Sequence, residues 1–231
     1  MFFLDPLYVL IMAPAILIML GTQWYVNSAY SRWSKVPSLS GMTGAQVAQR
    51  LIEAGGLYDV DIEIVGGRLS DHYDPRHKKL RLSQGVAQGT SVAATAIAAH
   101  ELGHAMQDSQ DYLPLRIRAG LVPAVNIGSS LGWILIFSGL LLGFTTLAWV
   151  GLAIFSGGAV FALATLPVEL NASARARTLL STTGIIASGK EERGVSTVLN
   201  AAALTYVAAL ISSLLQVLYF ALRIAGGGRR R

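Results

Sequence analysis

Four long apolar stretches organise the pattern of hydrophobic and polar positions along the chain. They run from Leu7 to Trp24, from Leu121 to Leu142, from Phe144 to Leu166 and from Val198 to Leu222. Each stretch is long enough to cross a hydrocarbon core of about 30 Å as a helix. Because only a short turn at Gly143 separates the second stretch from the third, these two predict a transmembrane hairpin.

Composition agrees with an integral membrane protein. Hydrophobic residues make up 53% of the 231 residues and charged residues 13%, and the mean hydropathy is +0.52, which is too apolar for an ordinary soluble domain. The first stretch lacks the basic leader and the small-x-small motif of a cleavable signal peptide, so we expect it to remain as an anchor. The net charge of +5 comes from basic residues beside the apolar stretches, which favours orientation in a bilayer over nucleic-acid binding. No nucleotide-binding motif is visible, so we expect ATP-independent action.

The polar region after the first stretch predicts a small α+β region. Ser34–Gly41 is a linker, and Thr43–Ala54 is an amphipathic helix that Gly55 and Gly56 terminate. Val60–Val65 and Lys79–Ser83 alternate apolar and charged residues, as exposed strands do. The simplest interpretation is a hairpin whose long polar turn is Leu69–Arg76. The alternative is an exposed strand edge that offers backbone hydrogen bonds to an extended peptide.

The pentapeptide His100-Glu101-Leu102-Gly103-His104 lies in the Ala-rich run from Ser91 to Asp108, which predicts a helix. Residues four apart lie on one face of a helix, so His100 and His104 can bind one metal ion. Glu101 then flanks the metal, where it can take a proton from an activated water and pass it to a leaving amine. A chance match on a buried helix is the alternative, but a core helix rarely carries two histidines and a glutamate on its apolar face.

A catalytic zinc ion needs a third protein ligand. The extended metzincin motif requires Gly at position 107 and His at 110, and the chain has Gln107 and Gln110. Glu169 is the preferred candidate among the glutamates downstream of the motif, because the predicted transmembrane hairpin returns it to the side of the histidines. The other candidates for this ligand are one histidine and two glutamates in polar segments: His72, Glu191 and Glu192.

Further residues could contact the substrate or orient the histidines. Asp71, His72 and Tyr73, in the polar stretch before the last strand, could bind substrate or stabilise an oxyanion. Arg175 could hold a substrate carbonyl or carboxylate, or could instead mark the cytoplasmic end of a span. Asn171 and Ser173 follow Glu169 within about one helical turn, so either side chain could accept a hydrogen bond from the N–H of a ligand imidazole.

Five blocks of the sequence resemble the membrane-bound neutral zinc metallopeptidases often called YugP-like. The blocks are Ser70–Arg76, Leu80–Ser83, Ala99–Gln107, Glu169–Ala176 and Val198–Ala209, in that order along nearly the whole chain. The resemblance implies a multi-pass bacterial peptidase of the gluzincin type, with one Zn²⁺ per chain. It further implies His100, His104 and Glu169 as zinc ligands and Glu101 as the catalytic acid and base. Soluble gluzincins often have an acidic residue four positions after the ligand glutamate, where this chain has Ser173.

These observations predict a predominantly α integral membrane protein: four transmembrane helices carry a small α+β, zincin-like catalytic region with a short sheet or hairpin. The predicted segments are an N-terminal span (1–26), a catalytic region (27–115), a transmembrane hairpin (116–166), a membrane-proximal segment with the third ligand (167–197) and a C-terminal span with a basic tail (198–231). Basic residues are more numerous beside the spans on the zinc side, so the active site is expected to face the cytoplasm at the cell membrane. The basic tail at 229–231 favours the opposite orientation.

The predicted function is that of a zinc metalloendopeptidase, a hydrolase that acts on membrane or membrane-proximal proteins or peptides. Two alternatives come from other classes. An intramembrane site-2-type protease would place the motif inside a spanning helix, and a non-proteolytic scaffold would use the metal structurally. The lipid bilayer and a peptide substrate are the expected partners, nucleic acids and nucleotides are not, and the sequence leaves the oligomeric state open.

Overall fold

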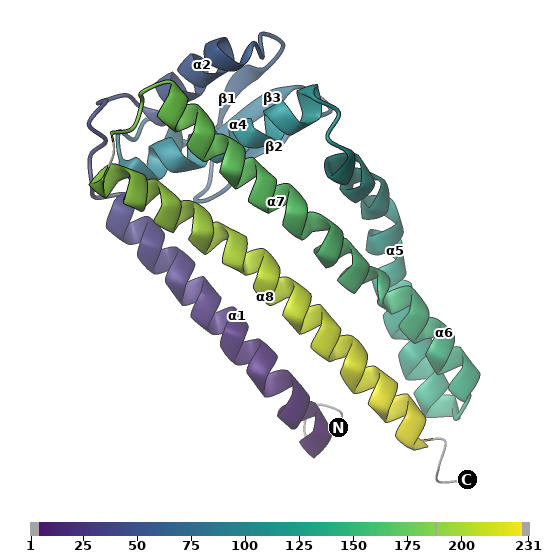
Figure 1. Cartoon of the computed structure of the whole chain (residues 1–231). Helices are drawn as coiled ribbons and strands as arrows, with labels where there is room; N and C mark the ends of the chain where they lie inside the picture. Colours follow the sequence, from purple (N-terminus) through teal and green to yellow (C-terminus); the bar gives the residue numbers. More distant parts are fainter. Residues whose placement is uncertain (1–4, 188, 228–231) are drawn as a thin grey trace. The chain divides into compact units, whose positions relative to one another are not determined.

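The computed structural model describes residues 5–187 and 189–227, so the basic tail used in the orientation argument lies outside the described part. Eleven elements follow one another in this part of the chain (Figure 1). They are α1 (Pro6–Trp33), α2 (Gly44–Gly55), β1 (Asp61–Val65), β2 (His72–Asp74), β3 (Lys79–Ser83), α3 (Gln84–Ala87), α4 (Val92–Ser109), α5 (Leu113–Leu142), α6 (Thr145–Phe155), α7 (Gly157–Thr182) and α8 (Lys190–Gly227).

Four helical segments of the described part are long and apolar enough to cross a membrane: Pro6–Trp33, Leu113–Leu142, Thr145–Thr182 and Lys190–Gly226. The predicted architecture of four spanning helices with a small α+β region is therefore confirmed. The helices continue beyond their apolar parts. Residues 190–194, a polar run with mixed charges, form the beginning of α8.

Contacts divide the chain into two compact units, and the long helices α1, α5, α7 and α8 each contribute to both. The first, here called the span unit, ends its first segment at Thr22 and continues with Arg116–Leu166 and the segment from Thr205 onward. The second, here called the sheet unit, comprises Gln23–Leu115 and Pro167–Leu204.

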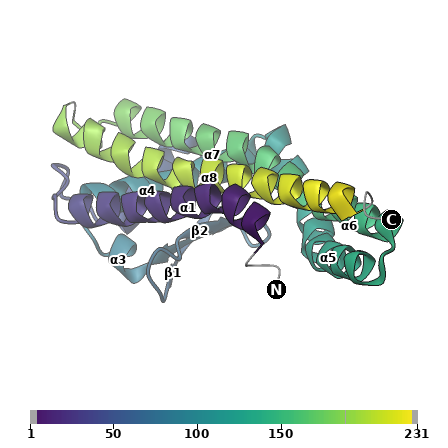
Figure 2. The same ribbon diagram turned by 90° about the horizontal axis from the view of Figure 1, so that it is seen from below.

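In the span unit, small residues let α5 and α6 pack closely, and Figure 2 shows the two helices side by side. A Cβ atom at Gly132 would come within 2.8 Å of the Phe155 Cβ, and one at Gly139 would overlap the Ala148 backbone. Close packing of this kind is typical of helices in a bilayer, where no hydrophobic effect drives their association. Six buried residues form the core of this unit: Ile136, Ala148, Leu152, Tyr219, Phe220 and Ile224.

The sheet of the sheet unit has the order β1-β3-β2, with β1 parallel and β2 antiparallel to β3. The predicted hairpin between the first and last strands is therefore wrong. The polar stretch contains β2, and the tight turn joins β2 to β3. Asp74 forms this turn because its Oδ1 atom accepts hydrogen bonds from the backbone N–H groups of Arg76 (3.0 Å) and His77 (3.4 Å).

One core joins the sheet to the helices that carry the site. Leu80 and Leu82 of β3 are fully buried with Leu51 of α2 and Leu102 of α4. The predicted amphipathic helix is confirmed as α2, which begins with a capping box between Thr43 and Gln46. Side chains of α7 and α8 complete the same core. Helix α4 thus lies between the sheet and α7 (Figure 1).

Candidate metal centre

His100 and His104 project from the same face of α4, whose first turn is capped by the Ser91 hydroxyl accepting from the Ala94 N–H. Their rings are in edge-to-face contact, with centroids 4.9 Å apart. Each side chain is 12% exposed. Neighbouring residues of α4, among them Ala98, Ala99 and Ala105, are themselves buried, so the two imidazoles lie in a largely dry environment.

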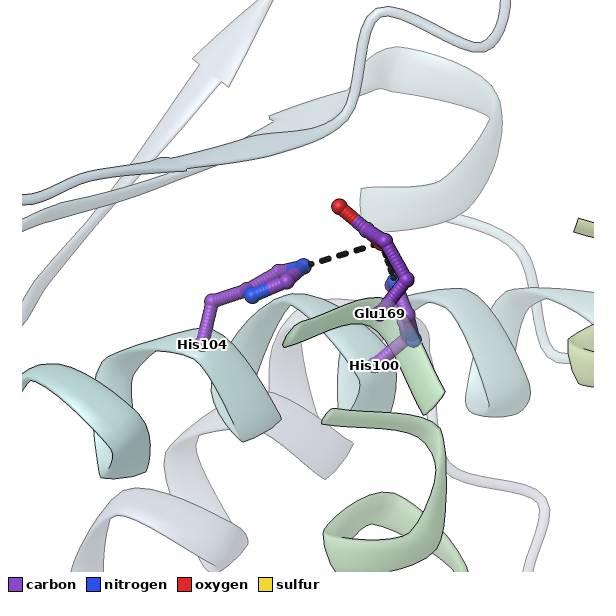
Figure 3. Close-up of side chains that lie close together, drawn as sticks. All are labelled: His100, His104 and Glu169. Atoms are coloured by element: carbon purple, nitrogen blue, oxygen red, sulfur yellow. Dashed lines mark ion pairs between the residues drawn. The ribbon is translucent and has the colours of Figure 1, made fainter. Parts of the chain in front are cut away.

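Glu169 projects from α7 toward both histidines (Figure 3). Its Oε2 atom lies 3.3 Å from His100 Nε2 and 3.4 Å from His104 Nε2, and its side chain is 3% exposed. Donor atoms of the three residues all lie within 4.8 Å of one another. Two ligand atoms on a tetrahedral zinc ion, each about 2.0–2.1 Å from the metal, are about 3.3–3.4 Å apart. The donor set and its spacing therefore fit one zinc ion with an open position for water or substrate.

Gly103, inside the pentapeptide, lets α7 approach α4 closely enough for this geometry. A Cβ atom at position 103 would overlap the Ala172 carbonyl oxygen and come within 3.1 Å of the Ala172 Cα. Ala172 lies three residues after Glu169 on α7. The absence of a side chain at Gly103 thus places the third donor beside the histidines.

The Nδ1 atom of each imidazole contacts a polar side chain. Ser173 Oγ lies 3.2 Å from His100 Nδ1, and Gln107 Oε1 lies 3.0 Å from His104 Nδ1. Such contacts hold a ligand ring in place and leave its Nε2 atom for the metal. Gln107 was considered in the sequence only as a departure from the metzincin motif. Its position three residues after His104, on the same face of a helix, is the signal that could have identified it.

The other predicted orienting residue, Asn171, does not contact an imidazole directly. Its Oδ1 atom accepts from Gln107 Nε2 at 2.9 Å and from Arg175 Nε at 2.7 Å. Arg175 also donates to Gln110 Oε1 at 2.6 Å and lies over the Tyr112 ring. These contacts join the end of α4 to α7, and the proposed role of Arg175 in substrate binding stays a prediction.

The side chain of Glu101 extends from α4 to strand β2. Its Oε2 atom accepts a hydrogen bond from the Tyr73 backbone N–H at 3.2 Å. Burial raises the pKa of the Glu101 carboxyl above its usual range, although the nearby charges of His100 and His104 act in the opposite direction. A raised pKa makes the carboxylate a stronger base, which suits proton transfer.

Burial and pairing have opposite effects on the pKa values of Glu169 and His104. Burial by itself would raise the pKa of Glu169, but hydrogen bonds with His100 and His104 outweigh it and hold that pKa well below its usual range. For His104, burial would lower the pKa, and the contacts with Glu169 raise it instead. The pairing therefore favours an ionised Glu169, the form that binds a metal, and a protonated His104, which would release a proton on binding one.

Of the three predicted substrate-contact residues, the structure brings the backbone of Tyr73 to Glu101. The Tyr73 hydroxyl donates to Asp108 Oδ2 at 2.8 Å, which directs it to the end of α4, and burial followed by this bond raises its pKa. Asp71 accepts hydrogen bonds from the Ser83 N–H (2.7 Å) and hydroxyl (3.1 Å). His72 is exposed and its Nδ1 donates to the Ser70 carbonyl at 2.8 Å.

Comparisons with known proteins agree with this geometry. The model of a protein family described as "Putative neutral zinc metallopeptidase" matches residues 8–225. A protein of Bacillus subtilis (strain 168), named "Putative membrane protease YugP", is 42% identical over 221 residues, which are 96% of this chain and 98% of that protein. No solved structure matches the chain.

Proposed function

Since the chain belongs to the neutral zinc metallopeptidase family, we propose that it is a membrane endopeptidase in which Glu101 acts as general base and general acid. His100, His104 and Glu169 would hold the Zn²⁺ ion that the family implies. The observation that carries the proposal is the position of these three donors beside Glu101, a carboxylate on the same turn of α4 that is not part of the donor cluster.

In this mechanism a bound zinc ion supplies Lewis acidity, which acidifies water and polarises a carbonyl group. Glu101 takes a proton from the attacking water as its oxygen bonds to the scissile carbonyl carbon. The same carboxyl then gives the proton to the amide nitrogen and the C–N bond breaks, which forms an amine and a carboxylic acid that loses its remaining proton to solvent. The Tyr73 N–H orients Glu101 by holding one of its oxygens, which leaves the other oxygen for the water.

Strand β2 offers the backbone edge for an extended substrate. It is an outer strand of the sheet, and the Tyr73 N–H points away from β3, toward Glu101. In a strand, the C=O of a residue points to the same side as its N–H, so the Tyr73 carbonyl also faces the free edge. Because the Tyr73 N–H already holds Glu101, a peptide in extended conformation would bond to the Tyr73 carbonyl and so run past the metal centre.

Membrane-associated proteins are the proposed substrates. Four spanning segments fix the protein in a bilayer, and Glu169 follows the predicted end of the third apolar stretch by three residues. Polypeptide segments that lie at or near the membrane surface would therefore meet the site most often. Equal cleavage rates for a soluble unfolded protein and for the same sequence tethered to the bilayer would contradict this part.

The two alternatives make different predictions. An intramembrane protease would place the motif in a spanning helix, whereas α4 belongs to the sheet unit and is not among the candidate spans of the described residues. A scaffold with a structural metal would be indifferent to Glu101, because that carboxylate is not in the donor cluster. The behaviour of a Glu101 variant therefore separates an enzyme from a scaffold.

The test measures zinc content and cleavage of a membrane-tethered peptide by detergent-purified protein. We expect Glu101→Ala to keep zinc and to lose about 10²–10⁴-fold in cleavage rate, and Glu169→Ala to lose both. Glu192→Ala is the matched control, since Glu192 is exposed on α8, and it should behave as wild type. Full activity in Glu101→Ala would reject the mechanism, and full zinc content in Glu169→Ala would reject the third ligand.

A further inference from the structure

Gln107 is a fully buried amide that contacts the candidate ligand His104 and, on its other side, helix α7. Its side chain is 0% exposed. Its Oε1 atom lies 3.0 Å from His104 Nδ1, and its Nε2 atom lies 2.8 Å from the Val168 carbonyl oxygen and 2.9 Å from Asn171 Oδ1. We propose that Gln107 is a positioning residue that sets the tautomer of His104, so that the Nε2 atom of that imidazole is free for zinc. This inference rests on the metal centre of the proposed function.

The direction of the Gln107 amide follows from the chemistry of its partners. A backbone carbonyl can only accept hydrogen bonds, so the group that faces the Val168 oxygen must be the NH₂ group. Asn171 supports the same orientation, because its Oδ1 atom also accepts from Arg175 Nε. The Gln107 oxygen is therefore the atom that faces His104.

An amide oxygen can only accept, so the hydrogen between Gln107 and His104 must come from the imidazole. His104 is then protonated on Nδ1, and in the neutral ring Nε2 carries the lone pair. That atom is the one that points to Glu169 Oε2, 3.4 Å away. The Val168 carbonyl thus fixes the direction of the Gln107 amide, and the Gln107 oxygen fixes the proton of His104 on Nδ1. As a result, the lone pair of the neutral ring lies on Nε2, on the side of Glu169.

The other histidine has no such constraint. His100 Nδ1 contacts the Ser173 hydroxyl, which can either donate or accept. The Gln107 contacts also connect the two ligand helices, since Val168 immediately precedes Glu169. Gln107 therefore combines an acceptor, which orients the imidazole of His104, with a donor group that holds α4 against α7.

These two roles can be separated by substitution. Gln107→Glu keeps an oxygen acceptor for His104 but removes both donor bonds, and Gln107→Met keeps the approximate volume and removes the amide altogether. Asn171→Ala removes one partner of the NH₂ group and leaves the oxygen that faces His104. A purely structural clamp predicts that zinc affinity falls together with the stability of the zinc-free protein in all three variants.

The experiment uses the full chain in detergent and measures the Kd for zinc by chelator competition and the Tm of the zinc-free protein. We expect Gln107→Met to weaken zinc binding by about 10–100-fold. Gln107→Glu should bind zinc at least as tightly as wild type even though its zinc-free Tm falls, and Asn171→Ala should stay within about 3-fold of the wild-type Kd. The opposite order would overturn the proposal: unchanged affinity in Gln107→Met, or a loss in Gln107→Glu as large as in Gln107→Met.

Zinc affinity is measured without cleavage, so this test and the test of the peptidase are independent. Zinc binding that follows the expected order in a protein without peptidase activity would reject the proposed function and keep the role of Gln107. If Gln107→Met does not fold, Gln107→Glu and Asn171→Ala still decide. A Kd that rises in Gln107→Glu in proportion to its loss of Tm would show a clamp only.

Discussion

At the scale of single residues, the metal centre depends on one position without a side chain. Gly103 faces the Ala172 carbonyl, and a methyl group there would overlap that oxygen. Helix α7 would have to move away from α4, and Glu169 would move with it. The pentapeptide pattern leaves this position free to vary, so the requirement for glycine here comes from packing and not from metal chemistry.

We expect Gly103→Ala to destabilise the protein by about 1–3 kcal/mol and to weaken zinc binding, because the third donor is displaced. The measurements are the Tm of the zinc-free protein and the Kd for zinc. Gly120→Ala is the control, because a Cβ atom there meets nothing within 4 Å and alanine favours a helix. Wild-type zinc affinity in Gly103→Ala would show that α7 can adjust without moving Glu169.

The residues of the site differ in how far sequence alone could identify them. Helical spacing places His100 and His104 on one face, and the return of a transmembrane hairpin brings Glu169 to the same side. Both arguments use only periodicity and length. The same spacing places Gln107 beside His104, but its role could not be predicted in this way, because that role depends on which atoms of α7 face Gln107. The position of α7 follows from its close approach at Gly103.

At the scale of elements, ion pairs connect the three strands of the sheet that supports the site. Arg81 on the central strand β3 bonds to Glu63 of β1 at 3.0 Å and to Asp74 of β2 at 2.7 Å. Bonds from Arg81 and then Lys79 hold the pKa of Glu63 below its usual value, and the His77 contact does the same for Asp74. Strands β1 and β3 were predicted from alternation, whereas β2 lies in the stretch that was predicted as a polar turn. The parallel pairing of β1 with β3 was not predicted, because alternation carries no information about strand direction.

The lowered pKa values of Glu63 and Asp74 predict a loss of stability in acid. A carboxyl whose pKa is lower in the folded state contributes stability above its unfolded pKa, and this contribution is lost as the pH falls through the folded value. The Tm of the zinc-free protein should therefore fall as the pH decreases below about 4.5, the ordinary pKa of glutamate. In Arg81→Met this acid-dependent part should be smaller, and an identical Tm-against-pH curve would contradict the role of Arg81.

Glu191 is buried although it lies in a run of charged residues. It lies among mixed charges that are typical of a solvated turn, yet it is 5% exposed. Its Oε1 atom accepts from the Ser38 hydroxyl at 2.5 Å and the Leu39 N–H at 3.1 Å, and its Oε2 atom accepts from the Ala187 N–H at 2.7 Å. The carboxylate thus joins the linker after α1 to the start of α8. Sequence alone could not predict the contact with the linker, because Ser38 and Leu39 lie about 150 residues away from Glu191.

We expect Glu191→Ala to destabilise the sheet unit by about 2–4 kcal/mol, since it leaves three buried or partly buried donors without their acceptor. Glu192→Ala changes the adjacent exposed glutamate and should cost less than about 0.5 kcal/mol. Thermal unfolding and the rate of limited proteolysis in the 34–41 linker would measure the difference. Equal stability of the two variants would show that water replaces the carboxylate in this linker.

At the scale of the whole molecule, the sheet unit is assembled from two parts of the chain that flank a transmembrane hairpin. Residues of both parts share one core: Leu102 and Leu51 come from the first, and Leu180 and Leu199 from the second. Both parts must therefore lie on one side of the membrane. The even number of crossings between them satisfies this requirement, and that much of the architecture follows from counting apolar stretches.

Which side they occupy can be tested with cysteines, because the natural chain contains none. The excess of basic residues beside the spans on the zinc side predicts the cytoplasm. Three exposed positions are suitable: Gln49 on α2, Glu192 on α8 and Thr146 in the first turn of α6. In intact cells, a membrane-impermeant maleimide should label Thr146→Cys and should label Gln49→Cys and Glu192→Cys only after permeabilisation.

The three variants separate two claims. Gln49→Cys and Glu192→Cys must behave alike, because the first lies before the transmembrane hairpin and the second after it, and unlike labelling would contradict an even number of crossings. Labelling of both from outside, with Thr146→Cys protected, would keep the four-span architecture and reverse the orientation. The substrates would then be segments exposed on the outer face of the membrane, while the chemistry at Glu101 would be unchanged, because it depends on the sheet unit alone.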